Sequence, residues 1–224
     1  MTSLKAFYQE ENPNQHGAVS PGRSRLFVEW AGSGKTVLDI GCADGHDGAL
    51  LIANGNIVHG IDVNERELAA AAQKGLITQP HDVSAGELPY ADATFDVVVA
   101  SDIIEHLVDT DAFLAGIRRV LKLGGILIVS TPNVASFGRR MMLLAGLNPY
   151  LEYSLEETVA GAKPVGHLRY FTASDLSRLL RKHGFEVREM TSNGLNLFLF
   201  TSPILGRLLP RLGVSLWVKA AKTS

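Results

Sequence analysis

Short apolar segments alternate with helical patterns along most of this chain, and no other feature constrains its fold as strongly. Residues 37–40, 57–61 and 95–100 are rich in valine, isoleucine and other apolar residues, which predicts buried strands. The stretches Glu65–Lys74 and Asp109–Leu121 have alanine-rich or amphipathic patterns that predict helices. Strand–helix alternation with short links predicts an α/β protein built on a doubly wound, mostly parallel, seven-stranded sheet.

The remaining elements complete a Rossmann-like order and leave one long connection. Further strands are expected near 76–78, 126–130, 185–190 and 215–219, with a helix over 174–183. About forty residues separate the strand ending at Ser130 from that helix, whereas such links usually span 2–6 residues. We therefore expect a cap insert after the fifth strand, over residues 133–170. Its run Met141–Leu144 suits an adaptable apolar pocket, or else simply covers the sheet.

Residues 1–30 are expected to form an N-terminal helical arm or lid, and 31–224 the main domain. Tyr8, His16 and Arg23 are candidate lid residues. The N-terminus is too polar for a signal peptide, and Leu195–Val218 is interrupted by prolines and arginines, so no membrane span is predicted. We expect that segment to be buried in a terminal hairpin, although peripheral membrane contact stays open.

The composition of the chain limits the kinds of partner that we expect it to bind. The net charge of -2 lacks the basic excess of nucleic-acid binders, so no nucleic acid is expected. The one cysteine, Cys42, allows no intramolecular disulfide and fits a reducing cytoplasm. The pairs Arg118–Arg119 and Arg139–Arg140 are interpreted as solvated helix faces. The oligomeric state is left open.

A glycine turn between the first strand and its helix, VLDIGCADG, indicates a small-molecule site. Dinucleotides and S-adenosylmethionine both use this geometry, and charge distinguishes them. Asp39 and Asp44 would repel a pyrophosphate at the helix N-terminus but attract an ammonium and a sulfonium. The spacing from Gly41 to Gly45 also differs from the G-x-G-x-x-G of dinucleotide enzymes.

Two later acids extend this site. Asp62 ends the second strand, where a carboxylate can accept hydrogen bonds from ribose hydroxyls, and Val63 follows it directly. Asp82 follows the third strand and offers a carboxylate to an exocyclic amine, with Val83 as an apolar neighbour for adenine. Asp39, Asp62 and Asp82 thus stand at the ends of three successive strands, a combination that strongly indicates one shared ligand site.

Five segments of the chain carry a family resemblance: VLDIGCADG, GIDVN, HDVS, FDVVVASDIIEHLVD and LKLGGILIVSTPN. In the order of these motifs the chain resembles class I S-adenosylmethionine-dependent methyltransferases. This resemblance spans residues 26–187. It implies that S-adenosyl-L-methionine is the cofactor and that Asp62 binds its ribose. It also implies that Asp82 and Val83 bind adenine, and that the methionine part is held by Asp39, Gly41, Cys42 and Gly45. The expected cofactor-binding set is completed by the intervening Ala43 and Asp44, by Val63 after the second strand, and by Ser101 after the central strand.

One position departs from the family pattern. Ala43 stands where many members have glycine, and we expect alanine to be tolerated there with a negative φ. The ending PN…GHLRYFT…DL…LL…GF further resembles a bacterial branch that includes proteins named for methionine biosynthesis protein W and quinone O-methyltransferases.

Catalysis of methyl transfer requires positioning of the acceptor and a base for its proton. Glu105 and His106 follow the central strand, and His167 lies in the insert. If residues 102–106 are helical, Asp102, Glu105 and His106 share one face. That arrangement resembles the acid-x-x-Glu-His motif of quinone O-methyltransferases, where it is associated with a divalent metal. We take Glu105, His106 and His167 as catalytic candidates and expect no metal, while a purely structural role for Glu105 and His106 stays open.

These patterns predict transfer of a methyl group from S-adenosylmethionine to an oxygen or nitrogen of a small-molecule or lipid-like acceptor. No Asn/Asp-Pro-Pro-aromatic segment follows FDVVVA, which argues against DNA adenine as the acceptor. The alternative is a non-catalytic cofactor-binding partner or regulatory subunit with the same fold.

Overall fold

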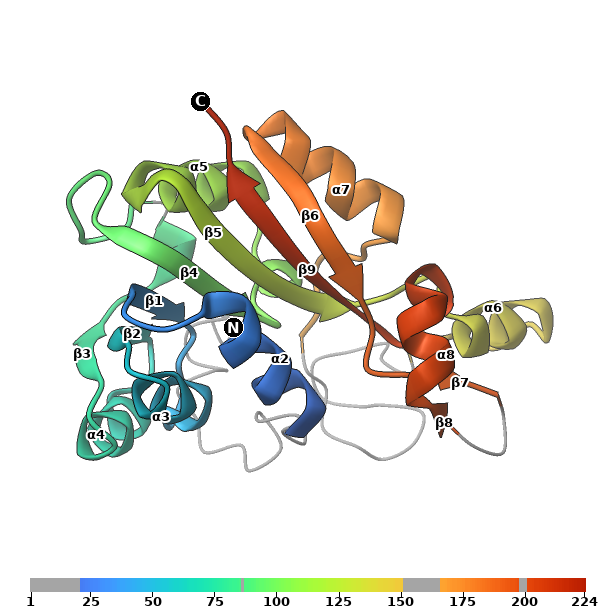
Figure 1. Ribbon diagram of the computed structural model, residues 1–224. Coiled ribbons are helices and arrows are strands. Elements are labelled where there is room, and N and C mark those ends of the chain that lie inside the picture. Colours follow the sequence, from blue (N-terminus) through green and yellow to red (C-terminus); the bar gives the residue numbers. More distant parts are fainter. Residues whose placement is uncertain (1–20, 86, 151–165, 198–200) are drawn as a thin grey trace, which may run out of the picture.

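The computed structural model describes residues 21–85, 87–150, 166–197 and 201–224 (Figure 1). In chain order the elements, with η marking a 3-10 helix, are α2 (Pro21–Ala31), β1 (Thr36–Ile40), α3 (His46–Ala53), β2 (Ile57–Asp62), α4 (Glu65–Gln73), β3 (Ile77–Pro80), η1 (Val83–Ala85), β4 (Phe95–Ser101), η2 (Ile104–His106), α5 (Thr110–Val120), β5 (Leu121–Pro132), α6 (Phe137–Leu144), α7 (Ala173–Lys182), β6 (Phe185–Thr191), β7 (Leu195–Asn196), β8 (Thr201–Ser202), α8 (Pro203–Leu208), η3 (Pro210–Leu212) and β9 (Ser215–Lys222).

A seven-stranded sheet forms the centre of the chain, in the order β3-β2-β1-β4-β5-β9-β6. Strands β1 to β5 pair in parallel, while β9 runs antiparallel to both β5 and β6. The chain leaves β3 at one edge and returns to β4 beside β1, so the strand order reverses between β1 and β4. The expected α/β fold, doubly wound and mostly parallel, is confirmed.

Helices cover both faces of this sheet, because its central strands are apolar on both sides. One face carries α5 and α7, which pack their apolar residues against alternate residues of β1, β4 and β5. The other face carries α2, α3 and α4, whose side chains include the stacked pair Phe27 and Trp30. Val98 points to the first face, and Val97 and Val99 point to the second. The β-branched run of β4 is therefore buried between two helical layers.

The helix before β5 ends one residue earlier than expected, and the strand starts earlier. Asp109 caps α5 by accepting a hydrogen bond from the amide of Ala112 at 2.8 Å. Its predicted apolar face is confirmed, since Phe113, Leu114, Ile117 and Val120 are buried. Gly124 and Gly125 lie inside the long strand β5.

The insert and the C-terminal segment differ most from expectation. Of the insert, α6 is described and buries none of its residues, and Leu143 and Leu144 are exposed. These two leucines therefore do not belong to the described core, and a pocket lined by the run Met141–Leu144 stays a prediction. Residues 151–165 lie outside the described residues, so a cap over the acceptor stays a prediction.

The expected burial of 195–218 in a terminal hairpin is only partly right. The short strands β7 and β8 do pair antiparallel, and β9 is buried in the main sheet. The intervening helix α8, however, leaves Ile204 and Leu208 largely exposed. No helix in the described ranges is long and apolar enough to cross a membrane.

Candidate functional site

The predicted cofactor residues gather where the parallel strands end. Asp39 lies in β1, Asp62 ends β2 and Ser101 ends β4, so all three belong to the carboxyl edge of the sheet. The reversal of strand order between β1 and β4 opens at this edge. In α/β sheets that point is where ligands bind.

The turn after β1 depends on three residues with left-handed backbone. Gly41 has φ 70°, Ala43 φ 46° and Gly45 φ 77°. The expectation of a negative φ at Ala43 is therefore wrong. The turn folds back on itself: the amides of Gly41 and Cys42 both donate to the Ile61 carbonyl of the neighbouring strand. The amide of Gly45 donates to the Cys42 carbonyl at 2.8 Å and closes the turn across Ala43, which adopts the left-handed conformation there.

Close packing explains two of the glycines near this turn. A Cβ on Gly45 would lie 2.8 Å from the Ala71 Cβ of α4, so only glycine lets the two segments approach. A Cβ on Gly60 would lie 2.7 Å from the Sγ of Cys42. The Cys42 thiol therefore faces the core beside β2, and burial raises its pKa. Any contact of Cys42 with a cofactor would be through its backbone.

Asp39 is a buried carboxyl whose surroundings in the described part of the chain disfavour its charge. Burial is the main cause that raises its pKa well above the usual range, and Asp47 and Asp62 raise it further. Arg23 acts in the opposite direction. A bound cation at this edge would stabilise the ionised carboxylate, which is what the ammonium of S-adenosylmethionine can provide.

Asp62 stabilises the glycine turn after β1 through hydrogen bonds. One carboxylate oxygen accepts from the amide of Ala43 at 3.0 Å, and the other accepts from the amide of Asn64 at 2.9 Å. Burial raises its pKa, while these backbone hydrogen bonds lower it. Each carboxylate oxygen keeps a further lone pair, so Asp62 can also accept from ribose hydroxyls.

Val63 lies just beyond the end of β2, in the bend that leads to α4. Its side chain is half-buried, and its backbone amide is a further group that lowers the pKa of the Asp62 carboxyl. The described contact of Val63 with the candidate site is therefore through its backbone. Its predicted contact with the cofactor stays a prediction.

Asp44 is held by residues of the two neighbouring helices. Its carboxylate forms an ion pair with Lys74 at 2.6 Å and accepts from the amide of His46 at 3.2 Å. The carboxylate therefore links the glycine turn to the end of α4. Its predicted contact with the cofactor likewise stays a prediction.

The other predicted cofactor residues also have protein partners. Asp82 accepts from the amide of Ser84 at 2.9 Å, and Val83 packs against the core, which leaves the short helix η1 beside the end of β3. The hydroxyl of Ser101 lies 3.0 Å from that of Ser130 on β5. These contacts fix where the side chains lie and are compatible with a ligand above them.

Arg23 of α2, which the sequence suggested only as a lid residue, is tied to the carboxyl edge. Its guanidinium pairs with Asp102 at 2.6 Å and lies 3.6 Å from Asp47. Its side chain is only 16% exposed, and the buried Nε finds no hydrogen-bond partner among the described residues. The other two lid candidates, Tyr8 and His16, lie outside the described residues.

The helical arrangement considered for residues 102–106 is wrong. Asp102 has φ 54°, and only Ile104–His106 form a 3-10 helix, η2. Asp102 is held outside that helix because its carboxylate accepts from the Ser130 hydroxyl at 2.8 Å and pairs with Arg23. It therefore does not share a face with Glu105 and His106.

His167, and not Asp102, lies beside Glu105 and His106. The rings of His106 and His167 lie 4.9 Å apart between centroids, and both are close to the Glu105 carboxyl. The segment after residue 165 is fixed here because the amides of Leu168 and Arg169 both donate to the Glu105 carbonyl, at 2.8 and 2.9 Å. The three predicted catalytic residues are thus brought together.

Both histidines are biased towards the neutral form. Burial is the main cause that lowers the pKa of His106, and it lowers that of His167 to about 4 with help from His106 and Arg139. The Nδ1 of His106 lies 3.3 Å from the Gly166 carbonyl oxygen. A carbonyl only accepts, so Nδ1 carries the proton and Nε2 keeps a lone pair that can accept one. His106 is accordingly prepared to act as a base.

Glu105 is a buried carboxyl with no hydrogen-bond partner among the described residues. It is 1% exposed, and burial together with Asp102 raises its pKa to about 8. The Thr131 hydroxyl lies nearby and lowers that pKa slightly, although the contact falls short of hydrogen-bond geometry. Glu105 is therefore mostly protonated at neutral pH and presents an unused polar group to the two histidines.

The same cluster has the ligand types of a divalent metal site. One ligand atom from each of Glu105, His106 and His167 lies within 4.8 Å of the other two. Two imidazoles and one carboxylate suit several first-row ions. Binding would require the Glu105 proton to leave, so the expectation of no metal stays a prediction with a direct test.

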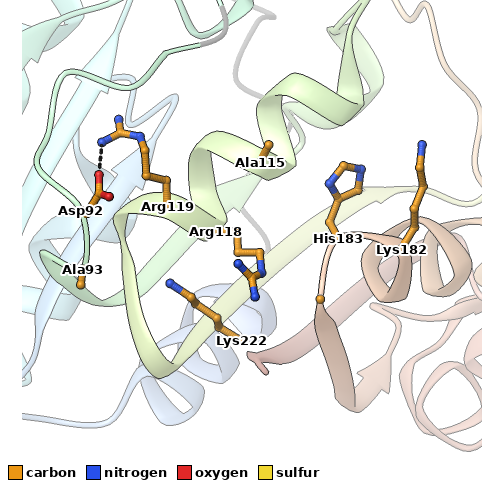
Figure 2. A pocket seen from close by; sticks show the side chains of 9 residues that line it. Asp92, Ala93, Ala115, Arg118, Arg119, Lys182, His183 and Lys222 are labelled. Carbon is orange, nitrogen blue, oxygen red and sulfur yellow. Dashed lines mark hydrogen bonds and ion pairs between the residues drawn. The ribbon is translucent and has the colours of Figure 1, made fainter. Parts of the chain in front are cut away.

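A different pocket, drawn in Figure 2, lies at the opposite edge of the sheet. Its lining includes the basic residues Arg118, Arg119, Lys182 and Lys222, together with His183. Arg119 pairs with Asp92 at 2.8 Å, and Lys182 pairs with Asp111 at 2.7 Å. Cations at the ends of α5 and α7 stabilise the helix dipoles, so this pocket has a structural explanation. None of the predicted site residues lines it.

The carboxyl edge fits S-adenosylmethionine on its own residues. Asp39 offers a buried carboxyl for the ammonium, Asp62 offers acceptors for hydroxyls, and Arg23 brings a guanidinium to the same edge, where it pairs with Asp102. A dinucleotide pyrophosphate would meet Asp39 and Asp62 instead. Fold and site together define the class I methyltransferase arrangement.

Comparison with known proteins gives the family. The model of the family described as "Methyltransferase domain" matches residues 8–190, which is most of the chain. The chain therefore belongs to this family, and its fold makes it a class I S-adenosylmethionine-dependent methyltransferase.

Two curated relatives show the range of proteins that the chain resembles. A probable S-adenosylmethionine-dependent methyltransferase of Mycolicibacterium smegmatis is 33% identical over 159 residues, covering 70% of this chain and 54% of the relative. The chain thus spans about half the length of that relative. A ubiquinone biosynthesis O-methyltransferase of Aromatoleum aromaticum is 30% identical over 169 residues, covering 73% and 69%.

Solved structures confirm the fold. The 1,6-didemethyltoxoflavin-N1-methyltransferase of Burkholderia thailandensis, solved with S-adenosylhomocysteine, aligns with a TM-score of 0.61 at 19% identity, covering 92% of this chain and 79% of that one. The cyclase SpnF aligns equally well, with a TM-score of 0.61 at 21% identity over 96% and 86%. This fold therefore does not by itself determine the reaction.

Proposed function

We propose that this chain transfers the methyl group of S-adenosylmethionine to a hydroxyl of a small-molecule or lipid-like acceptor. The observation that carries the proposal is the cluster of Glu105, His106 and His167 at the same sheet edge as Asp39 and Asp62. The cluster supplies a neutral imidazole beside a site suited to the donor. An oxygen acceptor is favoured over nitrogen because its proton must be removed by such a base.

Each residue of the cluster has a distinct part in the proposed reaction. When bound, the donor supplies a methyl carbon already activated by its sulfonium. Nε2 of His106 takes the proton of the acceptor hydroxyl as the oxygen–carbon bond forms and the carbon–sulfur bond breaks. The electron pair of the broken bond stays on sulfur. His167 and the protonated Glu105 hold His106 and exclude water from it.

Relatives support an oxygen acceptor without identifying it. Several curated relatives, from Aromatoleum aromaticum and Thiobacillus denitrificans among others, are named ubiquinone biosynthesis O-methyltransferases. The first relatives are considerably longer than this chain, and their names give no acceptor. The acceptor class is therefore proposed from the site and these names together.

The direct test is transfer of labelled methyl groups. The purified chain is incubated with methyl-labelled S-adenosylmethionine and either an aqueous metabolite extract or an organic lipid extract of bacteria. We expect a labelled product that resists mild base in the way an ether does, and its loss in His106→Ala. Donor binding without any labelled product in either extract would favour the alternative of a non-catalytic cofactor-binding partner.

A second variant separates the acceptor half of the site from the donor half. His167→Ala should lower kcat or raise the acceptor KM, because the ring lies against His106. Affinity for S-adenosylhomocysteine should be nearly unchanged. An equal loss of donor affinity would place His167 in the donor half, and no effect on either quantity would make it a structural histidine.

A further inference from the structure

The pocket in Figure 2, at the edge of the sheet opposite the candidate site, gathers positive charge from three separate elements. These cations lie in the last turn of α5, in the last turn of α7 and at the end of β9: Arg118, Arg119, Lys182 and Lys222. The pocket has a volume of about 660 Å³, which lies in the range of about 300–1,000 Å³ that small-molecule sites occupy. We call it the basic pocket.

The described acids beside the basic pocket are too few to balance its cations. Asp92 lines the pocket and pairs with Arg119 at 2.8 Å. Asp111 pairs with Lys182 at 2.7 Å. Four basic side chains and these two carboxylates leave a net charge of +2.

Arg118 and Lys222 carry this excess charge. Among the described residues neither has a carboxylate within ion-pair distance; Arg118 donates to the Thr223 carbonyl at 3.4 Å and Lys222 to the Leu121 carbonyl at 2.6 Å. Partial burial is the first cause that lowers the pKa of Lys222, and the nearby Arg118 is the second, while Asp92 raises it. A guanidinium has five N–H donors and an ammonium three, so most of their donors are left for an anion.

Helix dipoles account for basic residues at the ends of α5 and α7, but they leave part of this charge unexplained. Lys222 belongs to a strand. At the end of α5 the carbonyls of Arg119 and Val120 already accept from the amides of Ala93 and Thr94, at 3.0 and 2.8 Å. These hydrogen bonds satisfy the groups through which a helix C-terminus attracts cations. The excess charge therefore points to an anion from outside the chain.

We propose that the basic pocket binds the phosphate group of a small molecule through Arg118 and Lys222. A dianionic phosphate matches the net charge of +2, and guanidinium and ammonium groups are the donors that bind phosphate in proteins. Gly184 lets the guanidinium lie against the turn after α7, since a Cβ there would lie 2.7 Å from the Arg118 Nε. The volume accommodates more than a bare phosphate ion, so a phosphate monoester also fits.

This inference does not depend on the proposed function, because the basic pocket shares no residue with the candidate site. Calorimetric titration of the full chain, with inorganic phosphate and separately with glycerol 3-phosphate, tests it. Both titrations are held at constant ionic strength with chloride, so that general screening does not imitate binding. We expect saturable binding. Tighter binding of glycerol 3-phosphate would indicate a phosphorylated metabolite, and equal binding of both probes would indicate the phosphate group alone.

Variants locate the bound phosphate. The double variant Arg118→Gln with Lys222→Gln should weaken phosphate affinity at least about tenfold, because it removes two charged donors. The matched control is Arg188→Gln with Lys219→Gln, which removes one arginine and one lysine outside the pocket and should leave that affinity unchanged. Lys222→Gln alone should give an intermediate affinity, which keeps the test valid if the double variant does not fold.

Thermal unfolding without phosphate and calorimetry with S-adenosylhomocysteine check the fold of every variant. The absence of saturable phosphate binding by the natural chain would overturn the proposal. So would equal affinity in the natural chain and the pocket variants, or an equal loss in the control. Competition between phosphate and S-adenosylhomocysteine would also overturn it, because the anion would then lie at the donor edge.

Discussion

At the scale of single residues, Ala43 is the clearest case of a backbone conformation that its side chain does not favour. An L-residue other than glycine pays about 1–2 kcal/mol for the left-handed conformation that Ala43 adopts. Glycine avoids that cost but loses about 0.5–1 kcal/mol of backbone entropy on folding. We expect Ala43→Gly to raise the free energy of unfolding by about 0.5–1 kcal/mol.

Urea denaturation measures this difference. The matched control is Ala72→Gly, an exposed alanine with helical backbone in α4, which should destabilise by about 1 kcal/mol. A loss of stability in Ala43→Gly as large as in Ala72→Gly would mean that the turn does not strain residue 43.

The raised pKa of Glu105 predicts how the free energy of unfolding depends on pH. Its pKa is raised to about 8 from 4.5, so the folded protein favours the protonated carboxyl. The stability contributed by that proton is fully present below pH 4.5 and is lost as the pH rises through about 8. The two histidines act in the opposite direction, but only below their ordinary pKa of 6.5, where protonation would destabilise the fold.

Asp39 and Asp62 also have raised pKa values, so Glu105 is isolated by comparing the natural chain with Glu105→Gln, which imitates the neutral carboxyl. Between pH 6.5 and 8 the free energy of unfolding should fall more steeply in the natural chain than in the variant. The variant should also keep most of its methyl-transfer activity. Parallel pH dependence in the two proteins would show that Glu105 is ionised in the folded state.

At the scale of elements, Arg23 couples helix α2 to the donor site. Its guanidinium pairs with Asp102 after β4 and lies 3.6 Å from Asp47 of α3, at the edge of the sheet where we expect the donor to bind. A charge-assisted hydrogen bond contributes about 1.5–3 kcal/mol, so Arg23→Gln should weaken S-adenosylhomocysteine binding about 10–100-fold.

Calorimetry on Arg23→Gln and on Arg25→Gln provides the comparison, because Arg25 is an exposed arginine on the same helix. Thermal unfolding of both variants controls for the loss of the ion pair with Asp102. If the two variants bind S-adenosylhomocysteine equally well, α2 is attached to the sheet for stability alone.

Elements that depend on local pattern could be predicted from the sequence. The β-branched run 95–100 became β4 within one residue, and the face of α5 was correct, because burial on both sides of a sheet leaves a clear periodicity. The helix after the insert likewise begins at a local sequence pattern, because Thr172 and Asp175 form a capping box at the start of α7.

Features that depend on distant contacts could not be predicted. His167 lies beside His106 because the amides of Leu168 and Arg169 donate to the Glu105 carbonyl, about sixty positions earlier in the chain. The hydrogen bond between His106 and the Gly166 carbonyl joins the same two segments. Asp102 leaves the expected helix face for Arg23, whose position no pattern revealed. Apolar residues 204 and 208 gave a burial signal, yet α8 exposes them.

At the scale of the whole molecule, metal dependence separates two uses of the Glu105–His106–His167 cluster. We expect activity to survive extended treatment with EDTA, because a carbon attached to a sulfonium needs no Lewis acid to react. Full loss of activity that magnesium or zinc restores would turn the cluster into a metal site. Glu105→Gln gives an independent check, since an amide is a much poorer ligand than a carboxylate.

The central claim is that the carboxyl edge of the sheet binds S-adenosylmethionine through its acids. Titration calorimetry with S-adenosylhomocysteine, on the natural chain and on Asp62→Ala, measures it most directly. We predict binding that falls about 10–100-fold in the variant, and no measurable competition by a nicotinamide dinucleotide, whose pyrophosphate the acids repel. Unchanged affinity in Asp62→Ala, or dinucleotide binding as tight as that of S-adenosylhomocysteine, would contradict the account.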